Sequence, residues 1–383
     1  MTDNLIIDYA ARLENVREQM VQQGVALLFL PRSTNLHYLT GLRRPEPNYG
    51  NVVHPGEHVT GAWITVDADP IITMPRMVAE KTVLDGYEIR SLPDVQKPIE
   101  LARQVLADLN VPASAKIALD NRSWAESILM IQAVLPEASY ALAEDLLMPL
   151  RMVKDETEIA IMRRAGEITE MAYEAVRGKL QHGMTTLDLI SEVNYQLQRH
   201  GATTNSFATA FYNRGKNAPF APHNREETLL VPLEPPVAVS FDFGAVYGGY
   251  CYDYGRSVYF GEPDAEYRRA YALVMQSQAV GIKALSVGNT GEKADKVARD
   301  VLAEAGYGEA FRHRLGHAIG MDVHEIPFLM ESDHTPLQDG MCFTVEPSIS
   351  TKEMSARVED VVVVREGGGE VLTSGYQDLH VVS

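Results

Sequence analysis

Four acidic residues stand inside runs of otherwise apolar, strand-forming residues in the C-terminal half of the chain. They are Asp242 in VAVSFDF, Asp253 in YCYDYG, Glu346 in MCFTVEP and Glu359 in ARVEDVVVV. A carboxylate that is buried among Val, Phe and Tyr without a partner is strongly unfavourable. The fold must therefore place a cation or a proton beside these groups, and this requirement constrains the architecture more than any other feature of the sequence.

The two aspartates flank an expected β-hairpin. Residues 237–244 and 249–257 both have strand composition, and the segment 244–249 contains the glycines of a turn. Because side chains alternate along a strand, facing strands could bring Asp242 and Asp253 together. For either aspartate taken alone, a position at a strand end or a turn is the simpler explanation.

Three histidines fall within 12 residues, at His313, His317 and His324, with Gly316 and Gly320 beside them. A single histidine is more often a structural residue than a ligand, but three so close together are harder to explain by packing. The segment is not H-E-x-x-H, which excludes a helix-borne zinc site of that type.

The two glutamates lie in the last strand-like runs. Arg357 falls on the same face as Glu359, so a simple ion pair between these two residues is one explanation of Glu359. Two aspartates, one histidine and two glutamates from separate strands would instead form a two-metal site. Carboxylate oxygens with a single imidazole suit Mn²⁺ most, with Co²⁺, Fe²⁺ or Zn²⁺ also possible.

The hydrophobic pattern predicts two domains, residues 1–150 and 151–383, of the α/β (α+β) class. In the first domain it predicts helices over 8–23, 98–109 and 123–135, with strands over 25–30, 62–66, 71–74 and 116–119. In the second it predicts a long amphipathic helix after residue 158, helices over 186–200, 264–285 and 292–305, and strands from 237 onward.

Taken in order, these motifs resemble those of the pita-bread metallopeptidases, which include methionine aminopeptidase, aminopeptidase P, prolidase and creatinase. The resemblance covers about 151 to the C-terminus, and residues 1–150 look like the N-terminal domain of the prolidase and creatinase branch, for example in TNLHYLTG at 34–41. It implies a creatinase-like N-terminal α/β domain followed by a pita-bread catalytic domain.

The resemblance also assigns the metal ligands residue by residue. It implies that Asp253 and Glu359 bridge two divalent metal ions and that Asp242 chelates one of them. His317 and Glu346 then hold the other ion.

The same resemblance suggests roles in catalysis. Two cations that share a water lower its pKa and give a bridging hydroxide near neutral pH. Glu346 would take and relay the proton, and His223 and His324 would stabilise the oxyanion. His313 and Arg357 match further polar residues that the proline-peptidase branch keeps around the metals.

This sequence departs from the family pattern around the ligands. Gly255 stands where Thr is common, Ser348 replaces the Gly of Glu-Pro-Gly, and Ala318 replaces another Gly. Residues 325–340 contain no Lys or Arg. Prolidases take from this neighbourhood an arginine for the carboxylate of the dipeptide, so we do not expect a strict dipeptidase.

The leading functional hypothesis is a two-metal hydrolase that cleaves the peptide bond before proline, as an aminopeptidase or a dipeptidase. A second hypothesis keeps the fold and the metals but replaces the peptide by a small non-peptide amide or an osmolyte. A third, less favoured because all five ligands are present, is a non-catalytic binding module.

The charge composition of the chain disfavours some classes of binding partner. With 52 acidic against 34 basic residues, the formal net charge is −18, which disfavours nucleic acid and anionic membrane surfaces. The N-terminal segment lacks the basic start and apolar run of a signal peptide, so we expect the cytoplasm. The family resemblance adds the expectation of a homodimer.

Overall fold

The computed structural model describes residues 5–44, 56–215, 218, 228–373, 375 and 378–383. These residues form two compact units. One unit comprises residues 7–151, and the other comprises residues 152–383 together with Leu5 and Ile6. Each unit has its own sheets and its own apolar core, as the next paragraphs describe.

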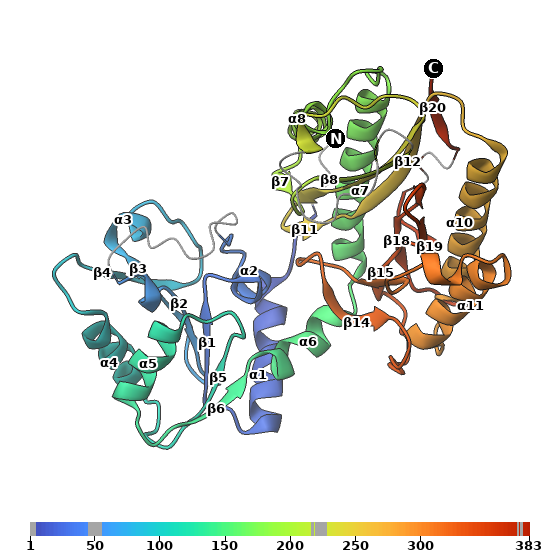
Figure 1. Ribbon diagram of the computed structural model, residues 1–383. Coiled ribbons are helices and arrows are strands. Elements are labelled where there is room, and N and C mark those ends of the chain that lie inside the picture. The colour runs from blue at the N-terminus through green and yellow to red at the C-terminus, as the bar shows by residue number, and fades with distance from the viewer. Residues whose placement is uncertain (1–4, 45–55, 216–217, 219–227, 374, 376–377) are drawn as a thin grey trace. The chain divides into compact units, whose positions relative to one another are not determined.

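The unit of residues 7–151 is built on one six-stranded sheet with the order β4-β3-β2-β1-β5-β6 (Figure 1). Its strands are β1 (Leu27–Pro31), β2 (Gly61–Ile64), β3 (Ile71–Pro75), β4 (Glu88–Leu92), β5 (Lys116–Leu119) and β6 (Ser139–Leu142). Strand β2 runs antiparallel to both of its neighbours, and the other pairs are parallel.

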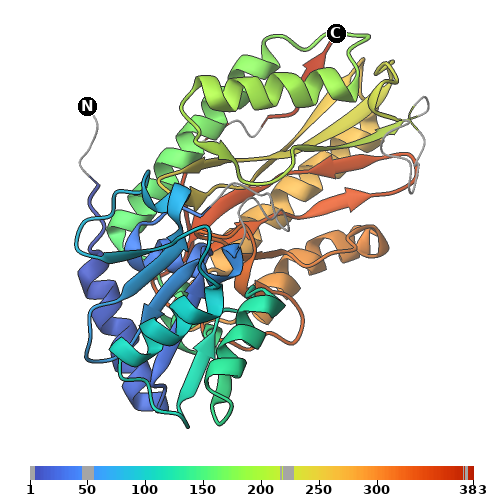
Figure 2. The same ribbon diagram turned by 90° about the vertical axis from the view of Figure 1, so that its left-hand side faces the viewer.

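Helices cover both faces of this sheet. They are α1 (Tyr9–Gln23), α2 (Thr34–Thr40), α3 (Arg76–Ala79), α4 (Pro98–Asp108), α5 (Ala125–Val134) and α6 (Glu144–Met152), with a 3₁₀ turn at Glu57–Val59. Leu101 of α4 and Ile131 of α5 share a buried core with Phe29 and Trp63 of the sheet, and α1 lies on the other face (Figure 2). The predicted helices and strands of this unit are confirmed, with small shifts at their ends.

The unit of residues 152–383 contains two larger sheets. A four-stranded sheet has the order β20-β12-β9-β8, and a five-stranded sheet has the order β14-β13-β15-β18-β19. The strands of these two sheets are β8 (Ala210–Gly215), β9 (Val237–Phe243), β12 (Tyr254–Phe260), β13 (Gly316–Ala318), β14 (Glu325–Leu329), β15 (Cys342–Val345), β18 (Asp360–Val363), β19 (Glu370–Val371) and β20 (His380–Val382). Shorter strands complete the unit: β7 (Thr204–Asn205), β10 (Ala245–Tyr247), β11 (Tyr250–Cys251), β16 (Ser348–Ser350) and β17 (Ser355–Arg357).

Two pairs of helices pack behind these sheets. They are α7 (Glu156–Arg177) with α8 (Thr186–Arg199), and α10 (Ala265–Ala284) with α11 (Gly291–Glu304), followed by a 3₁₀ turn at Gly308–Ala310. Side chains on Asp155 and Thr185 cap the starts of α7 and α8 by accepting backbone N–H hydrogen bonds. The four predicted helices of this unit are confirmed.

Side chains alternate along β9, so one face of the strand packs into the apolar core and the other faces the candidate site. Phe241 and Phe243 point toward α7, where the ring centroid of Phe241 lies 5.9 Å from that of Tyr173. Ser240 and Asp242 therefore point to the opposite side of the sheet. On the other half of the unit, Val274 of α10 shares a buried core with residues of β15 and β18.

The predicted hairpin around residues 244–249 is wrong in its detail. Strand β9 pairs with β12 along its whole length, and Asp242 faces Gly255. A smaller hairpin, β10–β11, is inserted between them and turns at Gly248 and Gly249, whose φ angles are +57° and +89°. Two consecutive positive φ angles suit a tight hairpin turn that only glycine adopts readily, so the turn forms there.

Three of the four acidic residues that were expected inside strands lie at breaks between strands. Asp253 lies between β11 and β12, Glu346 directly follows β15, and Glu359 lies between β17 and β18. Only Asp242 belongs to a regular strand. At a break the side chain is no longer bound to the strict alternation of the pleat, so residues from several strands can turn toward one point.

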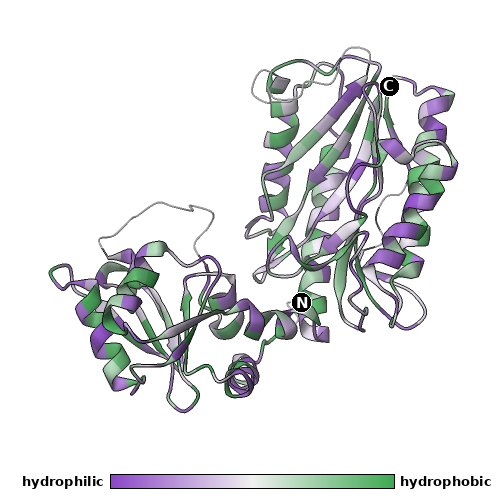
Figure 3. Cartoon of the chain, turned by 60° about the horizontal axis from the view of Figure 1, so that its bottom comes forward, coloured by the Kyte–Doolittle hydropathy of each residue, from purple (hydrophilic) through white to green (hydrophobic). Residues whose placement is uncertain are grey.

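Hydropathy along the chain agrees with this packing. Figure 3 shows hydrophilic and hydrophobic residues interleaved along the helices of both units, as expected for helices that bury one side. Among the described residues, none of the helices combines the length and the apolar character that a membrane crossing requires. Cys251 and Cys342 are both buried free thiols.

A buried ion pair supports the backbone at Glu359. Arg256 of β12 and Asp360 of β18 lie 2.6 Å apart, and both side chains are 2% exposed. The Arg256 guanidinium also donates to the carbonyl oxygens of Gly255 and Glu359, each at 2.8 Å. Gln278 of α10 donates to the second carboxylate oxygen of Asp360. This network ties the two sheets together directly beside a predicted ligand.

We predict that Asp360→Asn lowers the free energy of unfolding by about 3–5 kcal/mol, because it removes the carboxylate that pairs with the buried Arg256 guanidinium. Chemical denaturation monitored by circular dichroism measures this change. The matched control is Asp300→Asn, which removes the exposed ion pair with Lys296 on α11 and should leave the unfolding midpoint near that of the wild type. Equal stability of the two variants would contradict a structural role for the Arg256 pair.

Candidate metal centre and active site

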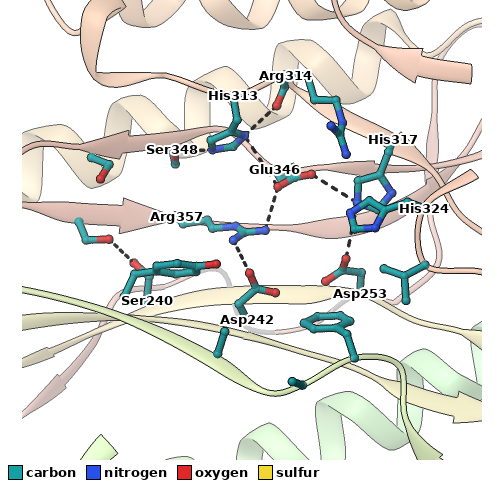
Figure 4. Close-up of a pocket in the computed structure, with 17 residues that line it drawn as sticks. Ser240, Asp242, Asp253, His313, Arg314, His317, His324, Glu346, Ser348 and Arg357 are labelled. Atoms are coloured by element: carbon teal, nitrogen blue, oxygen red, sulfur yellow. Dashed lines mark hydrogen bonds and ion pairs between the residues drawn. The ribbon is translucent and has the colours of Figure 1, made fainter. Parts of the chain in front are cut away.

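A pocket of about 640 Å³ opens between the inner sides of the two larger sheets. Figure 4 shows its polar side chains converging from both sheets. Asp242 of β9 and Asp253 enter from one sheet, and His317 of β13 and Glu346 enter from the other. The sheet faces turned away from α7 and α10 therefore supply the walls.

Three of the five predicted ligands form one compact group. Asp253, His317 and Glu359 each offer a ligand atom, and these atoms all lie within 4.8 Å of one another. The three residues are 4%, 2% and 0% exposed. An imidazole and two carboxylates at this spacing could hold one divalent cation.

The remaining two predicted ligands lie beside this group. Glu346 Oε1 is 3.5 Å from His317 Nε2, and Asp253 Oδ2 is 3.7 Å from the same nitrogen. Asp242 lies on the other side of Asp253. Burial is the main cause of the raised pKa of Asp253, and the negative charge of Asp242 raises it further. All five side chains are thus close to one another, although only three meet in the compact group.

His317 presents a free nitrogen to the cluster. Its Nδ1 lies 3.1 Å from the carbonyl oxygen of Ala318, which can only accept, so Nδ1 carries the proton. Burial lowers the pKa of His317 to about 3, so the ring is neutral at pH 7. The lone pair of Nε2 then faces Asp253 and Glu346, which is the tautomer that a metal ligand requires.

Two carboxylate oxygens in the compact group have no hydrogen-bond partner among the described residues. They are Asp253 Oδ1 and Glu359 Oε1, and both atoms are buried. An unsatisfied buried carboxylate oxygen is costly, and a bound cation satisfies it. The donor set and its unpaired atoms therefore fit divalent metal ions.

Arg357 occupies the centre of the carboxylates. Its guanidinium donates to Asp242 Oδ2 at 2.5 Å, to Glu346 Oε2 at 2.8 Å and to Glu359 Oε2 at 2.7 Å. The ion pair with Glu359 that was considered from the sequence is therefore present. It does not exclude metal binding, because Glu359 keeps its other oxygen unpaired.

One guanidinium does not balance four carboxylates. Burial raises the pKa of Asp253, Glu346 and Glu359, and the neighbouring carboxylates raise each of them further. Burial alone would lower the pKa of Arg357, but the surrounding carboxylates outweigh it and raise the pKa. The cluster therefore favours the addition of positive charge.

Gly255 allows Glu359 to approach the backbone. A Cβ at this position would lie 2.9 Å from Glu359 Cβ and 3.0 Å from Glu359 Oε2. The two residues exchange backbone hydrogen bonds, from Glu359 N to Gly255 O at 2.9 Å and from Gly255 N to Glu359 O at 3.3 Å. The departure from the family pattern at Gly255 thus lies directly against a predicted bridging ligand.

The other predicted histidines have different surroundings. His313 Nδ1 donates to the carbonyl oxygen of Arg314 at 2.8 Å, so its Nε2 accepts from the Ser348 hydroxyl at 2.7 Å. His324 lines the pocket, and its ring centroid lies 4.1 Å from that of His317. Burial lowers the pKa of both His313 and His324. His223 lies outside the described residues.

Sequence reasoning missed two pocket residues, Tyr212 and Arg314. The Arg357 guanidinium carbon lies 5.9 Å from the centroid of the Tyr212 ring, which makes Tyr212 part of the pocket wall. No sequence signal marked Tyr212. Arg314 stands between His313 and His317 in the histidine-rich motif, so its position in the sequence could have identified it.

Comparison with known proteins adds family information. A model described as "Metallopeptidase family M24" matches residues 160–366, more than half of the chain. A second model, described as "Creatinase/Prolidase N-terminal domain", matches residues 12–153. The two matches together span both units.

Relatives that align over nearly their whole length support the same family assignment. An "Xaa-Pro dipeptidase" of Lactobacillus delbrueckii subsp. lactis is 28% identical over 384 residues, covering 97% of this chain and 98% of the relative. A prolidase structure from Thermococcus sibiricus aligns with a TM-score of 0.89 and 25% identity, covering 98% of this chain and 100% of that one. An X-Pro aminopeptidase structure from Thermotoga maritima gives a TM-score of 0.82 and 28% identity, covering 97% and 99%.

These findings confirm the predicted fold class, a creatinase-type N-terminal domain followed by a pita-bread catalytic domain. They also confirm the family that the motifs suggested. The chain belongs to metallopeptidase family M24, in the branch that includes prolidases and X-Pro aminopeptidases, and it is a metal-dependent hydrolase.

Proposed function

We propose that this protein cleaves the peptide bond before proline in short peptides and uses two divalent metal ions to do so. The observation that carries the proposal is the convergence of Asp253, His317 and Glu359, with two unpaired buried oxygens, beside Asp242 and Glu346 in one pocket. The names of the similar proteins, Xaa-Pro dipeptidase and prolidase, support the choice of peptide bond.

The metal ions, with Mn²⁺ favoured, would be held by the five predicted ligands. Within this set Asp253, His317 and Glu359 offer ligand atoms that all lie within 4.8 Å of one another, and Asp242 and Glu346 lie beside them. When bound, such ions supply Lewis-acid chemistry, which activates water and stabilises negative charge. Arg357 donates to one oxygen of each of Asp242, Glu346 and Glu359, and it would hold these three side chains in place.

Glu346 is the proposed proton acceptor. Its Oε2 accepts from Arg357, and its Oε1 lies 3.3 Å from the Thr344 hydroxyl, so the carboxylate is oriented from two sides. A general base must lie within hydrogen-bond reach of the attacking water and keep a fixed direction. After accepting the proton, Glu346 would deliver it to the amine that leaves.

His324 is the proposed partner of the developing oxyanion. Its ring lines the exposed part of the pocket wall next to His317, and partial desolvation lowers its pKa, so the neutral ring can donate one N–H. A donor that is already oriented needs no rearrangement when negative charge develops on the carbonyl oxygen. We keep the same role as a prediction for His223, and we retain the cytoplasm and the homodimer as expectations.

We predict that Glu346→Gln lowers kcat for Xaa-Pro peptides by about 100-fold or more, because the amide cannot accept the proton. Stopped assays with metal-loaded protein measure the loss, and circular dichroism checks that the fold is intact. Glu353→Gln, an exposed glutamate outside the pocket, is the matched control and should leave kcat unchanged. An active Glu346→Gln variant that still contains metal would rule out this role.

We predict that removal of metal ions by a chelator abolishes hydrolysis and that Mn²⁺ restores it. Elemental analysis should find two divalent ions for each wild-type chain and a loss of metal in Glu359→Gln, because the unpaired Oε1 becomes a neutral amide atom. The Glu353→Gln control should retain both ions. Full activity after complete demetallation would refute the metal-dependent mechanism for this chain.

The choice of substrate is tested separately with a panel. We predict that metal-loaded enzyme hydrolyses Xaa-Pro peptides faster than matched Xaa-Ala peptides and faster than small non-peptide amides, as measured by release of the free amino group or ammonia. Hydrolysis of the small amides alone would overturn the proposed substrate class while keeping the metal chemistry.

A further inference from the structure

Arg314 is a pocket cation that has no assigned role. Its side chain is half-buried and lines the same pocket as Asp253, His317 and Glu346. Figure 4 shows it on the histidine side of the pocket, beside His313 and His317. Within the described part of the chain it forms no ion pair, and its buried Nε has no hydrogen-bond partner.

The backbone around Arg314 is held rigidly. Arg299 of α11 donates to the carbonyl oxygens of Phe311 and His313, each at 2.9 Å. Leu315 N donates to Asp295 Oδ1 at 2.8 Å, so α11 fixes this segment on both sides of Arg314. The backbone is therefore fixed where the Arg314 side chain leaves it, which limits the positions that the guanidinium can occupy.

His313 adds a direct contact with Arg314. Its Nδ1–H donates to the Arg314 carbonyl oxygen, and Ser348 holds the other ring nitrogen. Both nitrogens of His313 are therefore engaged within the protein. The ring fixes the peptide of Arg314, while the guanidinium of Arg314 keeps its polar edge available.

The guanidinium of Arg314 is also oriented. Its central carbon lies 4.7 Å from the centroid of the Phe328 ring on β14. A guanidinium that packs over one aromatic ring has one face covered and keeps its N–H edge for planar, two-pronged contacts. A carboxylate is the group that matches such an edge.

We propose that Arg314 is the anchor for a carboxylate group of the substrate. This inference rests on the proposed function and adds the substrate feature that the pocket recognises. A dipeptide carries such a group at its C-terminus, and a longer or amidated peptide could carry it on an acidic side chain before proline. The expected source is the C-terminus, because every dipeptide carries that carboxylate whatever its side chains. This reverses the expectation drawn from residues 325–340, which contain no Lys or Arg.

The test compares three substrates with metal-loaded full-length enzyme: Ala-Pro, its amide Ala-Pro-NH₂, and Glu-Pro-NH₂. The wild type should show a lower KM for Ala-Pro than for Ala-Pro-NH₂. In Arg314→Gln the KM for Ala-Pro should rise about 10- to 100-fold, the loss expected for a charged hydrogen-bonded pair. Hydrolysis of Ala-Pro-NH₂ should persist at the wild-type level, which also shows that the variant is folded.

Two further variants sharpen the comparison. Arg314→Lys keeps the charge but loses the planar fork, so its KM for Ala-Pro should be intermediate. Arg312→Gln removes an exposed arginine two positions away that does not line the pocket, and it should behave as the wild type. A preference for Glu-Pro-NH₂ over Ala-Pro-NH₂ that disappears in Arg314→Gln would place the bound carboxylate on the acidic side chain.

The proposal would be overturned if the ratio of the KM for Ala-Pro to the KM for Ala-Pro-NH₂ were the same in Arg314→Gln and in the wild type, and if the KM for Glu-Pro-NH₂ were also unchanged. Equal losses on all three substrates would also overturn it, because they would assign Arg314 a general role. If the wild type cleaves none of the peptides, the proposed function fails. Titration calorimetry with Ala-Pro and its amide then still decides whether Arg314 binds a carboxylate.

Discussion

The excess of negative charge in the pocket is the constraint on which the rest of the catalytic unit depends. Four carboxylates lie around one guanidinium, that of Arg357, which donates to three of them, while buried oxygens of Asp253 and Glu359 have no hydrogen-bond partner among the described residues. Arg357 can hold the carboxylates in place, but it cannot neutralise them. The buried carboxylates therefore repel one another in the folded chain, and bound divalent cations would relieve this repulsion.

The surrounding strands and helices hold the carboxylates in place despite this repulsion. Glu359, which is fully buried, is fixed through its backbone by Gly255 and by the guanidinium of Arg256. The helix pairs lie on the far sides of the sheets, so polar residues on the inner sides do not disturb the apolar core. A site built on two sheets that are held by separate helices can keep its carboxylates close together although they repel one another.

The sequence was sufficient for the helices and for the identity of the clustered residues. Strong apolar periodicity and capping residues such as Asp155 and Thr185 specify helix positions locally, and those predictions are correct. The antiparallel pairing of the strands around Asp242 and Asp253 was predicted, but its register was not, because a short inserted hairpin with its turn at Gly248 and Gly249 shifts it. Which strands pair depends on contacts between distant segments, and a local pattern does not contain them.

The hydrogen bonds of the individual histidines also could not be predicted from the sequence. The motif marks His313, His317 and His324 equally, yet the structure gives them different hydrogen bonds. A carbonyl oxygen accepts from Nδ1 in both His313 and His317, but only His313 has its second nitrogen bound, by the Ser348 hydroxyl. Ser348 is one of the departures from the family pattern, and its hydroxyl engages a His313 nitrogen to which a glycine at this position could offer no such hydrogen bond.

The departures at Ser348 and in residues 325–340 have a common physical consequence. One gives His313 a fixed partner and thereby fixes the peptide of Arg314, and the other removes cations from the segment after His324. Substrate anions bind where an oriented cation is available, and the structure provides one at Arg314 on the Phe328 ring. Since all five predicted ligands are present, these departures would leave the metal centre unchanged and act on the position of the substrate. On this proposal, recognition of the substrate carboxylate depends on one arginine outside the predicted ligand set, so it can change without any change in the charge balance that the metal site requires.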